Sequence, residues 1–258
     1  MLIKWNELNK NQYEAYVAHA YVAINIASTE QHSCHLPTGT DAIIGEAILE
    51  AAAAQSKADV IVLPQVCFGN SPHHRFAKGY ITIPQYVLVE YVKAICQSVY
   101  GSGFKRIFLV NSHGGNQAFL SVAVNEVGMQ LDGKLDVIAL QYWDLAKQRI
   151  SEIRESAIGG MCHAGELETS VMMYLAPELV DTNSITECAP APSNPWNELD
   201  LIGVKKYFRY SSFNIFNDDG NIGQPHMATL EKGKLFFDAA VDGLTVFFDY
   251  FMDHHSFV

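Results

Sequence analysis

The segment RIFLVNSHGGN, residues 106–116, joins an apolar run to a polar turn that contains two adjacent glycines. Its first six residues, 106–111, are mostly branched or aromatic apolar side chains, which is typical of a buried strand. Gly114 and Gly115 allow the backbone to turn sharply and to approach other groups closely. Residues 116–131 then have the spacing of a helix. A strand that passes through a turn into a helix is one unit of a parallel α/β sheet.

The same alternation continues on both sides of this segment. Further strands are predicted at residues 21–27, 59–63 and 135–141, and further helices at 41–55, 84–100, 166–175 and 230–254. Gly243 is a point at which the last helix would break. Loops are expected at 69–79 and at 188–197, where three of the nine prolines occur. The pattern predicts an α/β fold with three α/β/α layers and a mainly parallel sheet.

The bulk composition sets limits on size and partners. Of 258 residues, 49% are hydrophobic and 17% are charged, which suits a single domain over 1–258, although two small domains would also fit. There are 17 basic and 28 acidic residues, for a net charge of −11. This balance argues against nucleic acid as a partner, because a phosphate backbone is bound by a basic face.

Cysteine usage and hydropathy bear on location. The five cysteines are widely spaced and include no CxxC pair, as is typical of a reduced, intracellular chain. The first 20 residues contain lysine and glutamate and no apolar signal core. No uninterrupted apolar run approaches the roughly 18 residues that would span a membrane. We therefore predict a cytoplasmic protein with no membrane partner.

Polar clusters follow two of the predicted strands directly, and a third precedes a predicted helix. They occupy residues 30–41, 111–116 and 162–170. Open parallel sheets bind ligands at the carboxyl ends of their strands, so we expect these clusters to meet there.

The first cluster contains Glu30 and His32, which point the same way on an extended backbone because they are two residues apart. Carboxylate oxygen and imidazole nitrogen suit Zn, Mn or Fe. A solvated loop is the alternative for these two residues. Asp41 is equally explained as an acid at a helix N-terminus, and His113 in the second cluster as a cap of the following helix.

The third cluster contains His163, Glu166 and Glu168. Two residues apart on a helix, the glutamates diverge and do not share a face. At most one of them is therefore expected to reach a metal from a regular helix. Acids in a first helical turn are also favourable without any metal, but this leaves His163 unexplained.

These clusters carry a resemblance. Glu-Gln-His-x-x-His-Leu-Pro-x-x-Thr-Asp at 30–41, Asn-x-His-Gly-Gly-Asn at 111–116 and His-Ala-Gly-Glu-x-Glu-Thr-Ser at 163–170 resemble the motifs of the creatininase family, and 223–233 is similar to its closing motif. The resemblance implies a layered α/β/α fold and two divalent metal ions (Zn, Mn or Fe). It also implies hydrolysis of a non-peptide, often cyclic, amide or formamide bond by a metal-activated water. Homo-oligomers, frequently hexamers, are implied as well.

Carried over by position, the resemblance implies that Asp41 bridges the two metals. The other ligands would be Glu30, His32 and His113. Creatinine-cleaving members have a glutamate two residues after the strand-end histidine, where this chain has Gly115.

The last ligand is therefore assigned to Glu168, with Glu166 as its competitor and as a candidate general base. His163 matches the family histidine that passes a proton to the leaving nitrogen. The Trp-Asp pair of creatinine-cleaving members is replaced here by residues 159–162, Gly-Gly-Met-Cys, so a small-molecule amide other than creatinine is expected.

Two other functions stay open: a peptidase that acts on a modified peptide, and a non-catalytic binding protein with the same fold. His163 beside Glu166 favours an enzyme, because catalysis pairs an acid or base with the metal. Trp143, Ser71 and His74 are predicted to contact the substrate. Core packing is the alternative for Trp143, and a lid or subunit contact for Ser71 and His74.

Overall fold

The computed structural model describes residues 1–216 and 218–253. At its centre is a five-stranded sheet in which every neighbouring pair is parallel. The strand order is β1 (Leu2–Lys4), β3 (Val60–Val62), β2 (Tyr21–Ile26), β4 (Arg106–Asn111) and β5 (Asp136–Gln141). The parallel sheet predicted from the alternating pattern is thus confirmed.

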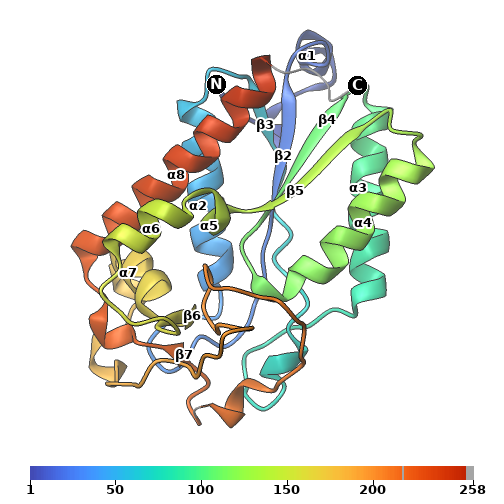
Figure 1. The fold of residues 1–258 in the computed structure, drawn as a ribbon. Helices are drawn as coiled ribbons and strands as arrows, with labels where there is room; N and C mark the ends of the chain where they lie inside the picture. Colours follow the sequence, from blue (N-terminus) through green and yellow to red (C-terminus); the bar gives the residue numbers. More distant parts are fainter. Residues whose placement is uncertain (217, 254–258) are drawn as a thin grey trace.

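Helices cover both faces of this sheet (Figure 1). One layer contains α1 (Lys10–Tyr16), α3 (Gln85–Gly101) and α4 (Gln117–Gln130). The other contains α2 (Thr40–Gln55), α5 (Tyr142–Leu145), α6 (Lys147–Ile153), α7 (Glu166–Leu175) and α8 (Leu230–Asp253). The three-layer α/β/α architecture expected from the sequence is therefore present.

Side chains of β4 alternate between the two cores that these layers enclose. Phe108 and Val110 pack on the side of α2 and α8, whereas Ile107 and Leu109 pack on the side of α3 and α4. All four are fully buried. A strand covered on both faces needs apolar residues along its centre, which explains the apolar run at 107–110 that predicted it. Each buried side chain of this size stabilises the fold by roughly 1.5–3 kcal/mol.

The predicted elements occur within a few residues of their expected ends. The predicted break at Gly243 is wrong, because α8 continues through it. A Cβ there would lie 3.0 Å from the backbone oxygen of Leu145, so the missing side chain makes room for α5. The last predicted residue of this helix, His254, lies outside the described residues. None of the described helices combines the length and the apolar composition that a bilayer-spanning segment needs.

A second, two-stranded sheet was not predicted. It pairs β6 (Met161–His163) with β7 (Ile222–Gly223) in antiparallel fashion. The amides of Glu166 and Gln224 both donate to the oxygen of Gly160, which ties β7 to the start of α7. This small sheet lies below the central sheet in Figure 1, and His163 is the last residue of β6.

Candidate metal centre

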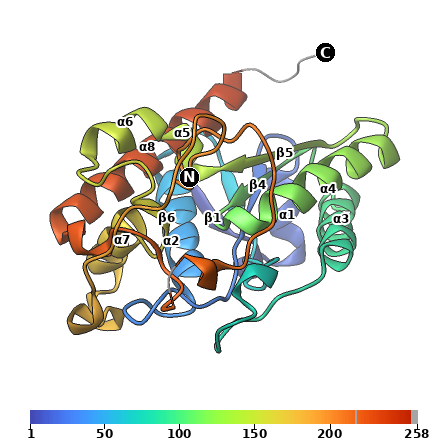
Figure 2. The ribbon, with the colours of Figure 1, turned by 60° about the horizontal axis from the view of Figure 1, so that its bottom comes forward.

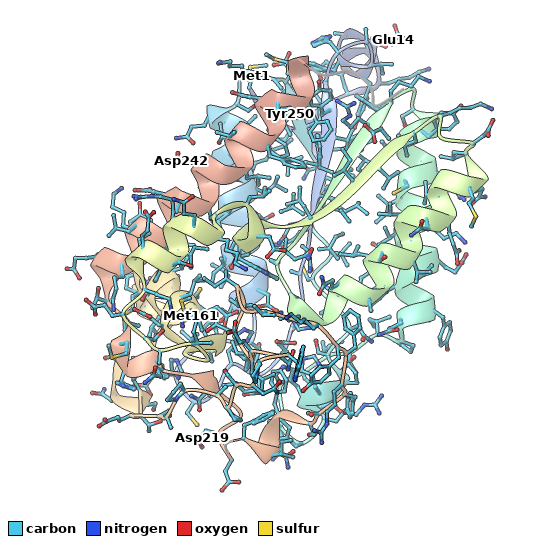
Figure 3. The ribbon with its side chains drawn as sticks, viewed as in Figure 1. Met1, Glu14, Met161, Asp219, Asp242 and Tyr250 are labelled. Atoms are coloured by element: carbon cyan, nitrogen blue, oxygen red, sulfur yellow. The ribbon has the colours of Figure 1, made fainter. Side chains whose placement is uncertain are left out.

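Polar side chains crowd the end of the molecule at which β2 and β4 finish. Figure 3 shows them gathered below the sheet, toward the end where Asp219 lies. The loop after β2, the first turn of α2, the turn after β4 and the region around β6 all contribute to this cluster. The cluster thus lies where the strand-end rule predicts a ligand site.

His32 has a hydrogen bond that fixes which of its nitrogens is free. Its Nδ1 lies 3.1 Å from the backbone oxygen of Glu30 and donates to it. Its Nε2 is therefore the nitrogen that faces Asp41 Oδ1 at 3.2 Å and Glu168 Oε1 at 4.0 Å, with no hydrogen-bond partner. The lone pairs of this nitrogen and these two oxygens repel one another unless a proton or a metal cation lies between them.

His113 repeats this arrangement. Its Nε2 lies 3.3 Å from the backbone oxygen of Asn70 and donates to it. Its Nδ1 is then free and faces Asp41 Oδ2 at 3.1 Å and Glu30 Oε1 at 3.3 Å. Each oxygen of Asp41 thus reaches a different imidazole, which is the geometry of a bridging carboxylate.

Four groups of side chains bring their ligand atoms within 4.8 Å of one another. Two of these groups share Asp41: one adds Glu30 and His113, and the other adds His32 and Glu168. Glu30 Oε2 and Asp41 Oδ2 are buried without a hydrogen-bond partner among the described residues. Oxygen and imidazole donors in this number fit a pair of Zn, Mn or Fe ions.

The charges of the cluster are strongly coupled. Burial alone would lower the pKa of His32, but the carboxylates of Asp41 and Glu168 outweigh it and raise this pKa to about 9. Burial raises the pKa of Glu168 to about 7, against the opposing effect of His32. For Glu30, burial is outweighed by His113 and His74, which hold its pKa well below the usual range. A proton and a metal ion would compete for the same atoms.

His163 lies beside the same carboxylate. Its Nε2 is 2.8 Å from the backbone oxygen of Gln31 and donates to it, and its Nδ1 faces Glu30 Oε1 at 3.6 Å. Burial and the neighbouring His32 and His74 hold the pKa of His163 well below its usual value. This lowered pKa favours the neutral ring, whose Nδ1 is directed at Glu30.

Glu166 and Glu168 point to different surroundings. The Glu166 carboxylate lies 2.7 Å from Lys232 Nζ and accepts hydrogen bonds from the amides of Glu155 and Ser156. It belongs to none of the four groups found among the described residues. The structure brings Glu168 to the cluster and leaves the expected competitor, Glu166, in a separate buried ion pair.

The residues expected to contact substrate are placed differently. Ser71 and His74 are fully buried: Ser71 Oγ is 3.2 Å from His113 Nε2, and His74 Nε2 is 3.1 Å from Glu30 Oε1. Trp143 is buried in the hydrophobic core beside Tyr142. None of the three is among the described residues that line the adjoining cavity. Ser71 and His74 therefore contact side chains of the centre, and Trp143 packs in the core.

Sequence reasoning missed the aromatic cover of the centre. The ring of Phe213 lies 4.5 Å from His73, 4.9 Å from His74 and 5.4 Å from His163, measured between ring centroids. The adjacent pair of histidines at 73 and 74 was a signal of function. Phe213 carried no such signal in the sequence, because it follows an irregular segment with no periodicity.

The crowding around Gly115 explains why this chain departs from the creatinine-cleaving pattern at that position. A Cβ at this position would lie 2.3 Å from the backbone oxygen of Asn70, 2.4 Å from His113 Nε2 and 3.0 Å from His73 Cε1. Any side chain here would displace the loop or the imidazoles. Glycine is therefore required where those members have glutamate.

The fold and the cluster together define a class: an α/β protein with a buried histidine and carboxylate centre that fits a pair of divalent cations. The chain belongs to the creatininase family, whose model, described as creatinine amidohydrolase, matches residues 6–248. The fold and the motifs that resembled this family from the sequence are thus confirmed.

The names of individual relatives give different activities. The chain is 29% identical to a mycofactocin precursor peptide peptidase of Mycobacterium ulcerans, over 86% of this chain and 81% of that protein. It is 24% identical to a creatinine amidohydrolase of Pseudomonas putida, over 92% and 93%. A 3-dehydro-scyllo-inosose hydrolase of Thermotoga maritima is 22% identical, over 86% and 75%.

Solved structures show the same fold. One described as "Creatininase Mn" superposes with a TM-score of 0.83 at 23% identity, over 98% of this chain and 99% of that one. A creatininase mutant described as "Zn-Zn type" superposes with a TM-score of 0.82 at 24% identity, over 98% of both.

Proposed function

We propose that this protein is a metal-dependent amidohydrolase that cleaves the carbon–nitrogen bond of a non-peptide amide or formamide. The observation that carries the proposal is the position of Asp41 between two imidazoles whose free nitrogens both face it. Glu30, Asp41 and His113 would hold one ion, and His32, Asp41 and Glu168 the other. Two such ions, when bound, supply an activated water and polarise the amide carbonyl.

The surrounding hydrogen bonds orient these ligands. The backbone oxygens of Glu30 and Asn70 hold the rings of His32 and His113 in one tautomer. The amide of Ala164, whose φ is +48°, donates to Glu168 Oε2 at 2.6 Å and leaves Oε1 directed toward His32. Partners of this kind are worth about 10–100-fold in metal affinity or activity.

His163 would move the proton that the reaction requires. Its free Nδ1 faces the centre, while the backbone oxygen of Gln31 fixes Nε2–H. In this proposal, Nδ1 accepts a proton from the attacking water and donates it to the departing nitrogen. Proton transfer through a positioned side chain contributes roughly 10²–10⁴ in rate.

A second candidate is a peptidase that acts on a modified peptide. It is favoured by the similarity to mycofactocin precursor peptide peptidases at 28–29% identity, which exceeds the 24% to the creatinine amidohydrolase. The third candidate is a binding protein without catalytic activity.

Incubation of the metal-loaded protein with cyclic ureides, formamides and short peptides separates the three candidates. We expect turnover of a ureide or formamide. Hydrolysis of peptides alone would establish the second candidate, and no turnover across the panel the third.

The metal assignment has its own test. We expect Asp41→Ala to lose both ions, measured by elemental analysis of the purified protein. Asp59→Asn is the matched control, because Asp59 is an acid on the surface that pairs with His19. Two ions retained per chain in Asp41→Ala would falsify the bridging role.

We further propose a cytoplasmic homo-oligomer, with a hexamer as one expected form. The five cysteines are widely spaced and include no CxxC pair, in keeping with a reducing compartment. Exposed apolar side chains on α3 and α4, Tyr86, Tyr91 and Met129 among them, offer a surface that a second subunit would cover. Light scattering on the eluted protein measures the mass, and a monomer would contradict this proposal.

A further inference from the structure

The cavity next to the candidate metal centre has two unlike walls. Its volume is about 480 Å³, which suits a small organic substrate. One wall is formed by the histidines and carboxylates of the centre. The other is formed by residues 192–216, here called the strap, which crosses in front of the carboxyl end of the sheet (Figure 2).

The strap contributes two basic side chains to the cavity. Lys205 and Arg209 are the only lysine or arginine among the described residues that line it. Lys205 is held in a short antiparallel bridge with Asn197. Burial raises the pKa of the Cys162 thiol to about 12, and the positive charge of Lys205 is the largest effect that opposes this rise. Lys205 and Cys162, the residue that precedes His163, both line the cavity.

The neighbouring lysine points elsewhere. Lys206 Nζ lies 5.1 Å from the centroid of the Trp196 ring and forms a cation–π contact with it. Lys206 is not among the described residues that line the cavity. Two adjacent lysines with the same charge therefore differ in whether they face the cavity, which supplies a matched control.

The charge balance of the cavity differs from that of the chain. The chain carries a net charge of −11. In the cavity, Asp200 is already paired with Arg154 at 2.9 Å, which leaves three carboxylates, those of Glu30, Asp41 and Glu168. Two divalent ions would outweigh these three charges, and Lys205 and Arg209 would add two more positive charges. A metal-loaded cavity is therefore positive in an acidic protein, and its field favours an anion.

We infer that the substrate is an anionic amide whose carboxylate or phosphate-type group, remote from the bond that is cleaved, is bound by Lys205 and Arg209. Arginine matches such oxyanions with two parallel hydrogen bonds, and lysine adds a point charge. Tyr207 and Phe208, which also line the cavity, offer an apolar surface to the rest of the molecule. This inference rests on the proposed hydrolase function, because it concerns the substrate of the same site.

The test measures binding to metal-loaded protein by calorimetry and does not require turnover. The probes are N-acetyl-L-phenylalanine, its phosphonate analogue and its neutral N-methylamide. We expect at least one of the two anions to bind about tenfold or more tighter than the methylamide, in line with the strength of charge-assisted hydrogen bonds. Whichever anion binds tighter identifies the oxyanion.

Variants separate the strap from the metals, because an anion can also bind a metal directly. The double substitution of Lys205→Gln and Arg209→Gln should remove the preference for the anion and leave binding of the methylamide within about twofold. Lys206→Gln should change neither. Equal binding of anions and methylamide to the parent, or an anion preference that survives the double substitution, would overturn the inference. A lack of hydrolysis across the amide panel would refute the enzymatic proposal while leaving this binding comparison intact.

Discussion

The metal centre and the strap face each other across one cavity, yet they are built in opposite ways. Side chains of the centre are buried, come from strand ends and helix starts, and are held by backbone hydrogen bonds. The strap is irregular, and Phe208 and Tyr210 on it are 93% and 67% exposed. The difference indicates a division of labour, in which a rigid scaffold holds the chemistry and a surface segment selects the substrate.

The largest expected effect falls on the buried side of this comparison. His163→Ala should lower kcat by roughly 10²–10⁴, because Nδ1 no longer transfers a proton. Both metals should be retained, since the proposed ligands are unchanged. Steady-state kinetics on the first active amide, together with elemental analysis, provide the measurement. A kcat within a few-fold of the parent would remove His163 from the reaction, whereas loss of a metal would reassign it as a ligand.

The next effect tests whether Glu166 is structural. Lys232→Met should lower the free energy of unfolding by about 3–5 kcal/mol, because it leaves the Glu166 carboxylate buried without its partner. Activity per folded molecule should stay near that of the parent. Lys234→Met is the control, since Lys234 forms an exposed pair with Asp238, and pairs of this kind contribute about 1 kcal/mol or less. Denaturant unfolding gives both values. A fall in kcat without a loss of stability would instead support Glu166 as a base.

A smaller effect is expected at the turn after β4. Gly115→Ala should weaken metal binding by about 10–100-fold, because its Cβ would displace His113 or the backbone at Asn70. Gly114→Ala is the matched control, since a Cβ at that position meets nothing within 4 Å. Competition with a chelator measures the affinities. Equal affinities in the two variants would show that the crowding at position 115 does not matter.

The smallest effect belongs to the strap. Phe213→Leu keeps an apolar side chain but removes the ring that contacts the histidines of the centre. Aromatic contacts of this kind are worth about 0.5–1.5 kcal/mol, so KM should rise by several-fold with kcat nearly unchanged. A fall in kcat at constant KM would place Phe213 with the chemistry and weaken the division drawn above.

The sequence predicted the scaffold better than the strap, for physical reasons. A strand buried on both faces must be largely apolar, so β2 and β4 were evident as apolar runs, and polar residues at their ends marked the centre. The sequence of the strap has no helix or strand periodicity, and Phe213 contacts the histidines of the centre only through the tertiary fold. Gly243 was misread for a similar reason, because its neighbour Leu145 is about a hundred residues away in the chain.

Glu30 contributes to both proposed ion positions. Its carboxylate faces His113, while its backbone oxygen orients the ring of His32. A displacement of this one residue would disturb both positions together. Filling either position should therefore preorganise the other, and titration with zinc should proceed cooperatively rather than as two independent steps.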